Sequence, residues 1–206
     1  CQSWHPVWGE ESEILDNHRE MRVNLSQPKS GRRIAVVFRV FNDGIGFRYE
    51  FPRQKGLGDF VIAEELTEFA FPANHTTWSI PAEGLRFYEG LFRKLPLDSI
   101  GYASTPVTIR TADGMHMALH EANLTDYAAM NVRSKAGSNT LRASLTPWSN
   151  GDLVRVTTTR VSPWRTLIIA DNAGDLALNR VMLNLNEPCA IPDAADFCKP
   201  QKYVGV

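Results

Sequence analysis

The residues with the clearest potential for chemistry lie within residues 115–127. Alternation of apolar and polar residues predicts a strand over residues 115–120, with His116 and His120 on the face opposite the apolar side chains. This strand runs directly into Glu121, so that two adjacent side chains able to bind a metal are expected at the rim of a sheet. Rims and loops of rigid β scaffolds are common places for functional sites. The first place to expect a site is therefore the pair His120–Glu121.

Residue chemistry leaves three interpretations of Glu121 open. A carboxylate is a hard oxygen donor that suits calcium, whereas an imidazole beside it suits zinc. Zinc would need further histidines or cysteines at regular spacing, and the remaining histidines are scattered: His5, His18, His75 and His116. On residue type alone, a solvent-exposed surface glutamate is the simplest interpretation. The acidic pairs Glu10–Glu11 and Glu64–Glu65 are likewise expected to be solvated.

A compact aromatic and basic motif, SPWRT, opens another predicted strand at residues 162–166. Trp164 and Arg165 are candidates for contacting a sugar, together with His120, although burial of the indole in a core is the simpler interpretation. The chain has no nucleophile elbow, phosphate loop or dinucleotide fingerprint. A pair of carboxylates for glycoside hydrolysis needs a defined separation in space, which spacing in sequence does not provide.

Composition narrows the class of protein. The chain has 206 residues and a formal net charge of −1, so no basic surface points to nucleic acid. No apolar run reaches the length of a membrane span. The cysteines, Cys1, Cys189 and Cys198, are too few for a disulfide framework. For Cys189 and Cys198 we weigh a loop-closing bridge against two buried thiols.

The elements that must position these residues are short strands separated by turns. Turn residues 42–44 join two strands in the strongest hairpin signal, at residues 34–41 and 47–51. Further strands are predicted at residues 20–25, 60–66, 75–80, 106–111, 126–132, 139–146, 154–159 and 164–170. Asp171 is expected to cap a short helix through Leu178, and residues 81–101 to form a short helix or a loop. The pattern predicts an all-β fold, an antiparallel β-sandwich.

Several motifs, in the same order along nearly the whole chain, resemble glycoside hydrolase family 97. They are WHPVWGE at residues 4–10, FRVFNDGIGFRYEFP at 38–52, LHEA at 119–122, PWRT at 163–166, LNLNEPC at 183–189 and KYVGV at 202–206. The resemblance implies bacterial, mostly periplasmic, exo-acting α-glucosidases and α-galactosidases. Their three-part design has an N-terminal β-super-sandwich, a catalytic (β/α)8 barrel and a small C-terminal β domain.

The resemblance implies a division of this chain and a role for one residue. Residues 1–186 would be the N-terminal sandwich with its first strands missing, and residues 187–206 a linker and the first strand of an absent barrel. Glu121 matches the glutamate that the family's sandwich sends to an active-site calcium. The general acid and base would belong to the barrel, so the chain alone is expected to be inactive. Its partners would be that barrel and an α-linked oligosaccharide.

Two other functions remain open from the sequence. A free-standing carbohydrate-binding sandwich would use Trp78, Trp148 or Trp164 as stacking platforms, and a structural domain would only stabilise a partner. The sequence does not separate glucosides from galactosides, or inversion from retention, because the resemblance assigns those determinants to the barrel.

Overall fold

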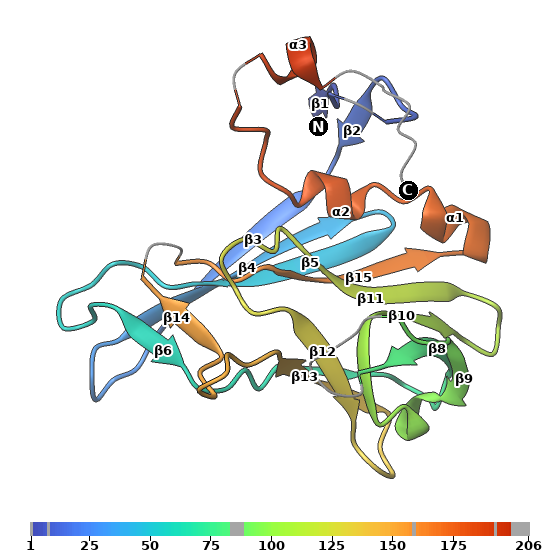
Figure 1. Ribbon diagram of the computed structural model, residues 1–206, viewed down its shortest axis with the longest axis horizontal. Helices are drawn as coiled ribbons and strands as arrows, with labels where there is room; N and C mark the ends of the chain where they lie inside the picture. The colour runs from blue at the N-terminus through green and yellow to red at the C-terminus, as the bar shows by residue number, and fades with distance from the viewer. Residues whose placement is uncertain (1, 8, 83–88, 158–159, 192, 199–206) are drawn as a thin grey trace.

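The computed structural model in Figure 1 describes residues 2–7, 9–82, 89–157, 160–191 and 193–198, and these residues form an all-β fold. The strands are β1 Gln2–Trp4, β2 Ile14–Asp16, β3 Arg19–Ser26, β4 Arg33–Phe41, β5 Gly44–Glu50, β6 Phe60–Ile62, β7 Glu68–Ala70, β8 Thr76–Pro81, β9 Arg93–Pro96, β10 Tyr102–Arg110, β11 His116–Ala122, β12 Met130–Ser134, β13 Thr140–Leu145, β14 Val154–Val156 and β15 Trp164–Ala170. Short helical turns complete the fold: η1 Leu97–Ser99, α1 Ala173–Ala177, α2 Val181–Asn184 and α3 Ala194–Phe197. The predicted all-β antiparallel class is confirmed.

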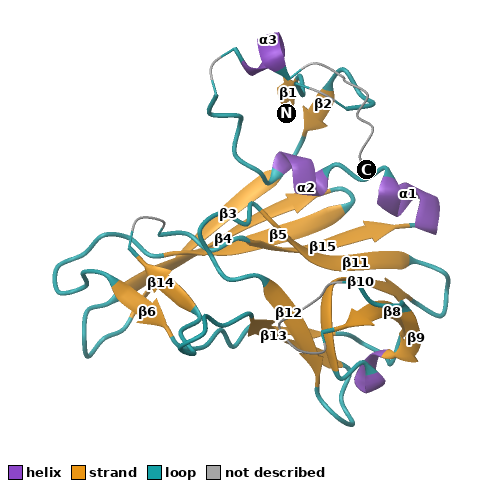
Figure 2. Cartoon of the chain, in the orientation of Figure 1, coloured by secondary structure: helices purple, strands orange, loops and turns teal. Residues whose placement is uncertain are grey.

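Most strands belong to one curled antiparallel sheet, with the order β3-β4-β5-β15-β11-β10-β12-β13-β7. Strands β8 and β9 extend it from the other side of β10. Two small sheets, β1-β2 and β14-β6, lie outside this path. Figure 2 shows the helical turns α1 and α2 near β5 and β15, at one side of this sheet. Among the described residues, no helix is long and apolar enough to cross a membrane.

The sheet divides at β10. Residues Tyr102–Ser104 pair with β12, whereas Val107–Arg110 pair with β11, and the register against β8 shifts between these two halves. The Thr105–Pro106 peptide bond, which is cis, lies at this shift. One branch therefore continues through β11, β15 and β5, and the other through β12 and β13. The C-terminal end of β11 faces the point where the branches separate.

The buried apolar residues form three cores. The larger core is made by Leu97, Ile100, Ala103, Val107, Ile109, Met117, Leu119, Val132 and Leu141. A second, on the side covered by α2, is made by Val37, Ala122, Trp164, Val181 and Leu185. A third lies under the small β14-β6 sheet and contains Met130, Ala143, Leu145, Val154 and Val156. The end of β11 lies among all three cores.

The structure corrects several predicted boundaries. The helix α1 is capped by the Asn172 side chain, which accepts hydrogen bonds from the Gly174 and Asp175 amides, and not by Asp171. Residues 81–101 contain strand β9 and the turn η1 among their described residues. The acid-rich opening contains a short strand, β2, that the sequence did not predict. The strand predicted at the end of the chain, within residues 202–206, lies outside the described residues.

Candidate functional site

Strand register places Glu121 directly opposite Arg165. The two residues are cross-strand partners on β11 and β15, and the Arg165 Nη1 atom donates a hydrogen bond of 2.6 Å to Glu121 Oε2. Glu121 is 6 % exposed and Arg165 is fully buried. Continuing the alternation of β11 explains this, because Glu121 falls on the same face as the buried Met117 and Leu119. The interpretation of Glu121 as a solvated surface residue is wrong.

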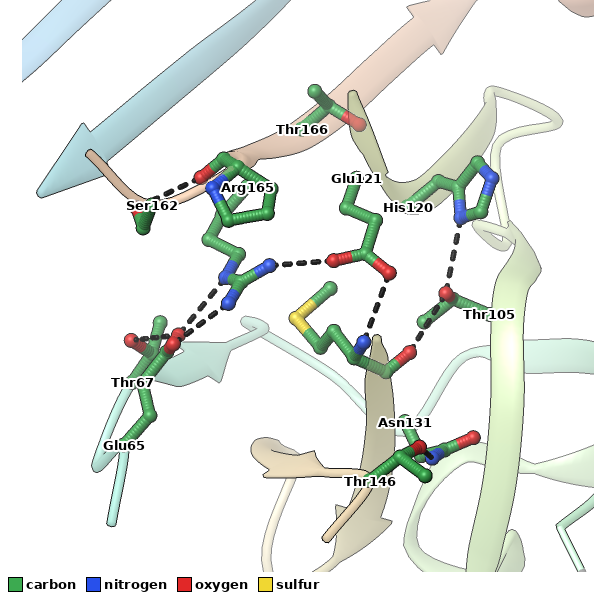
Figure 3. A network of polar contacts seen from close by, with 12 residues as sticks. Glu65, Thr67, Thr105, His120, Glu121, Asn131, Thr146, Ser162, Arg165 and Thr166 are labelled. Carbon is green, nitrogen blue, oxygen red and sulfur yellow. Dashed lines mark hydrogen bonds and ion pairs between the residues drawn. The ribbon is translucent and has the colours of Figure 1, made fainter. Parts of the chain in front are cut away.

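A second carboxylate holds the other side of the same guanidinium group. Glu65, between β6 and β7, accepts hydrogen bonds from Arg165 Nε at 2.9 Å and from Arg165 Nη2 at 2.6 Å. Thr67 Oγ1 donates to Glu65 Oε1 at 2.9 Å. Figure 3 shows Arg165 between the two glutamates. Glu65 is 8 % exposed, so the expected solvation of the Glu64–Glu65 pair is wrong for Glu65; Glu64 remains exposed and pairs with Arg142.

This Glu65–Arg165–Glu121 cluster is connected to the point where the sheet divides. Glu121 Oε1 accepts a hydrogen bond of 2.8 Å from the backbone amide of Met130, the first residue of β12. On β10, the Thr105 hydroxyl donates to the Met130 carbonyl at 2.9 Å and lies 3.0 Å from His120 Nδ1. Glu121 and Thr105 thus connect β11 and β10 to the start of β12 through side-chain hydrogen bonds. These bonds lie at the point where backbone pairing between the two branches ends.

The electrostatics of the cluster are unbalanced. Two carboxylates share one guanidinium group, which leaves one excess negative charge when both are ionised. Burial raises the pKa of the Glu121 carboxyl, although the Arg165 charge acts in the opposite direction. Burial alone would lower the pKa of Arg165, but the hydrogen bond and charge of Glu65 raise it, so this residue stays cationic. With both carboxylates ionised, the cluster is a buried anion, and an additional cation would favour that ionised form.

Calcium needs several oxygen ligands close together, and the described residues meet this need only in part. They contain no group of three or more histidine, cysteine, aspartate or glutamate side chains placed to hold a metal. The donor chemistry of Glu121 nevertheless suits a hard cation, because Oε1 accepts only the Met130 amide and a carboxylate oxygen has a second lone pair. Among the described residues, Glu121 is thus the carboxylate that suits the ion, and calcium typically takes six to eight oxygens. One carboxylate does not complete that set.

The other candidate sugar contacts are placed differently. Trp164 is fully buried against α2 and lies between the guanidinium groups of Arg39 and Arg48, at 4.9 Å and 4.6 Å from its ring. Neither Trp164 nor Arg165 therefore presents a surface to a sugar, and packing is the role that the structure gives to this indole. Trp78 is half-buried, whereas Trp148 is exposed beside Arg155.

His120 is partly buried next to the cluster, with Nδ1 directed at Thr105. Burial lowers the pKa of this imidazole, which favours its neutral form. The cysteine predictions are both wrong, because Cys189 and Cys198 are free and exposed. They lie outside the cores, in the segment that contains α3.

Sequence reasoning missed Glu65 and Thr105. The alternation of β11, extended by one step, would have placed Glu121 on the core face and so called for a buried partner. Glu65 carries no comparable signal, because it meets Arg165 across 100 residues of sequence. Only the folded topology brings those residues together.

Comparison with known proteins identifies the class. The sequence profile described as Glycosyl-hydrolase 97 N-terminal matches residues 1–188. The fold is similar to a glycoside hydrolase family 97 enzyme in complex with acarbose from Pseudoalteromonas sp. strain K8, with a TM-score of 0.88 and 40 % identity over 94 % of this chain and 30 % of that chain. A β-arabinopyranosidase, at 20 % identity and a TM-score of 0.74 over 83 % of this chain and 30 % of that one, shares the fold.

Two curated relatives are also similar to this chain. One is a retaining alpha-galactosidase of Bacteroides thetaiotaomicron, 21 % identical over 81 % of this chain and 29 % of that protein. The other is a probable retaining alpha-galactosidase of Streptomyces bingchenggensis, 31 % identical over 69 % of this chain and 21 % of that protein. The chain spans less than a third of the length of these relatives. It belongs to glycoside hydrolase family 97 and corresponds to the N-terminal domain of those enzymes.

Proposed function

We propose that this chain is the sandwich part of a calcium-dependent bacterial α-glycosidase, which packs on a catalytic barrel of the same polypeptide and donates Glu121 to calcium. The observation that carries the proposal is the buried cluster at the end of β11, where two carboxylates share one guanidinium group, in a chain that belongs to this family. A calcium ion, when bound, would supply positive charge that positions and polarises groups in the active site.

The residues of this chain have a supporting part in that chemistry. Arg165 and the Met130 amide orient the Glu121 carboxylate, and the three cores hold their strands in place. The general acid and base would come from the barrel, together with the other calcium ligands. The substrate would be an α-linked glucoside or galactoside of an oligosaccharide. Relatives named as retaining alpha-galactosidases, and a family 97 enzyme solved in complex with panose, support this class of substrate. We place the parent enzyme in the periplasm.

Hydrolysis of aryl α-glucosides and aryl α-galactosides tests the proposal. The 206-residue chain is expected to show no turnover, with or without calcium, while the full-length enzyme turns over one substrate and loses that activity on chelation. In the full-length enzyme, Glu121→Gln should lower both the activity and the calcium affinity. The control Glu64→Gln removes an exposed carboxylate outside the cluster and should match wild type. Calcium-dependent turnover by the short chain, abolished by Glu121→Gln, would show that the catalytic carboxylates lie within this domain and that the assignment is wrong.

A further inference from the structure

We infer that Arg165, clamped by Glu65, is a positioning residue that fixes the Glu121 carboxylate so that only Oε1 is available to a cation. The inference rests on the proposed function, because it concerns how Glu121 is presented to calcium. It adds two residues, Glu65 and Arg165, that would control calcium affinity without touching the ion.

The division of hydrogen bonds within the cluster carries the first step. Arg165 uses Nε and Nη2 for Glu65 and only Nη1 for Glu121. Because Nη1 occupies Glu121 Oε2 at 2.6 Å, a cation approaching that oxygen would meet the guanidinium charge. Among the described residues, Glu121 Oε1 accepts a hydrogen bond from the Met130 amide and not from Arg165, so one of its two lone pairs is not used. Glu121 is thereby set up as a monodentate ligand.

The role of Glu65 follows from the geometry of the guanidinium group. The planar fork of Arg165 is held through two parallel bonds to Glu65, an arrangement that a lysine ammonium does not reproduce. With Glu65 in place, Arg165 has a single N–H group directed at Glu121. Without that anchor, the fork is free to turn and take both oxygens of Glu121. Glu65 therefore keeps Oε1 free.

The charges of the cluster also lead us to expect that Glu65 supports calcium binding. Glu65 and Glu121 together outweigh Arg165 by one negative charge, which attracts a cation to a buried place where screening is weak. Replacing Glu65 by the isosteric glutamine makes the remaining Arg165–Glu121 pair neutral. The fold is expected to survive, because Arg165 and Glu121 still satisfy each other. If this ion pair only stabilised the sheet, Glu65→Gln would leave the calcium affinity unchanged.

The matched variants are Glu65→Gln and Glu64→Gln, which remove the same charge from adjacent residues. Only Glu65 belongs to the cluster, since Glu64 is exposed and pairs with Arg142 at the surface. In the full-length enzyme, calorimetric titration should show calcium affinity about tenfold weaker or more for Glu65→Gln, the size typical of partners that orient a metal ligand. Glu64→Gln should bind as wild type does. Arg165→Lys, which keeps the charge but not the fork, should also weaken binding.

A second readout does not depend on calcium. The Met130 amide reports the position of Glu121 Oε1, so its hydrogen-exchange protection in the metal-free 206-residue chain should fall in Glu65→Gln and not in Glu64→Gln. Equal calcium affinity in the two variants, or unchanged Met130 protection, would overturn the positioning role. A wild-type full-length enzyme that binds no calcium would overturn the proposed function, and the availability of Oε1 to calcium with it. The Met130 result would still decide whether Glu65 and Arg165 position Glu121.

Discussion

Removing Glu65, Arg165 and Glu121 from water costs free energy that their mutual attraction only partly offsets. Apolar residues of similar volume often stabilise a core at least as well as a buried ion pair does. The cluster also leaves one carboxylate charge unmatched, which apolar packing would avoid. At the residue scale, then, folding stability is a weak explanation for this arrangement. The proposed orientation of Glu121 toward a cation would use both the second carboxylate and the fixed geometry.

A different carboxylate, Glu50, determines part of the response to acid. Arg22 Nη1 lies 2.6 Å from Glu50 Oε2, and Arg48 Nη2 lies 2.9 Å from Glu50 Oε1. Burial alone would raise the pKa of Glu50, but the hydrogen bond from Arg22 and the two guanidinium charges lower it from its ordinary value of 4.5. A carboxyl group with a lowered pKa in the folded state stabilises the protein above its unfolded pKa. That contribution disappears as the pH falls from about 4.5 through the folded-state pKa.

We therefore expect Glu50→Gln to reduce the free energy of unfolding at neutral pH, by less than about 1 kcal/mol because the pair is near the surface. Urea denaturation across a pH series should show this difference shrinking below about pH 4.5. Glu64→Gln serves as the control. A Glu50→Gln deficit that is constant down to strongly acidic pH would show that the effect does not come from the ionised carboxylate.

The candidate site was only partly predictable from sequence. Residue type and the position of residues 115–121 pointed to Glu121, and the family motifs imply a calcium-binding role that stays a prediction. Its burial was not expected, because the strand was assumed to end before Glu121, although β11 continues to Ala122. Trp164 illustrates the converse, since an aromatic residue that opens a strand suits either a core or a ligand surface. The choice between them depends on α2, which covers this indole.

At the element scale, the approach of α2 to β5 depends on Gly46. A Cβ atom added there would lie 2.5 Å from Leu185 Cδ1 and 3.4 Å from Trp164 Cε3. Leu185 is buried, so its side chain has little room to move. Gly46→Ala should therefore lower the free energy of unfolding by about 1–3 kcal/mol.

Chemical denaturation of Gly46→Ala beside Gly58→Ala would measure this effect. Gly58 has open space around its Cβ position, so its substitution should change stability by less than about 1 kcal/mol. In a Leu185→Ala background, Gly46→Ala should cost less stability than it does in the wild type, because the clashing atoms are gone. Equal stability of the two glycine variants would mean that α2 does not pack on β5 as described.

Element prediction succeeded where strands carry a complete local signal. The strand predicted at residues 164–170 is β15, and the predicted hairpin is β4 and β5, although β5 already begins at Gly44 and not at Phe47. Prediction failed where long-range contacts or backbone conformation determine where a strand begins or ends. The apolar run at residues 60–66 forms a strand only over β6, because Glu65 is drawn into the cluster with Arg165. Strand β12 begins at Met130 and not at Asp126, whose positive φ of 49° interrupts an extended chain.

At the scale of the whole molecule, the sheet ends at β3, an edge strand whose free side can pair with another strand. Among the described residues, β3 bonds only to β4, and nearly every side chain along it is exposed. Its apolar side chains alternate, with Met21 56 % and Leu25 49 % exposed on either side of Val23. Long, exposed edge strands with an apolar face are templates for another strand. Met21 and Leu25 therefore give the β3 edge an exposed apolar stripe.

The sequence of β3 is compatible with antiparallel pairing between two copies of the chain. In a register centred on Val23, Met21 of one copy lies opposite Leu25 of the other, and Arg22 lies opposite Asn24, so no like charges meet at these positions.

We expect the 206-residue chain to self-associate as its concentration rises, in light scattering coupled to size-exclusion chromatography. Val23→Lys should shift it toward monomer, because two lysines would then face each other across the two-fold axis. The control Leu178→Lys, at an exposed apolar residue beside α1, should associate as wild type does. Association that is indifferent to Val23→Lys would locate the contact elsewhere, and a wild-type monomer at high concentration would show that the β3 edge is protected in solution.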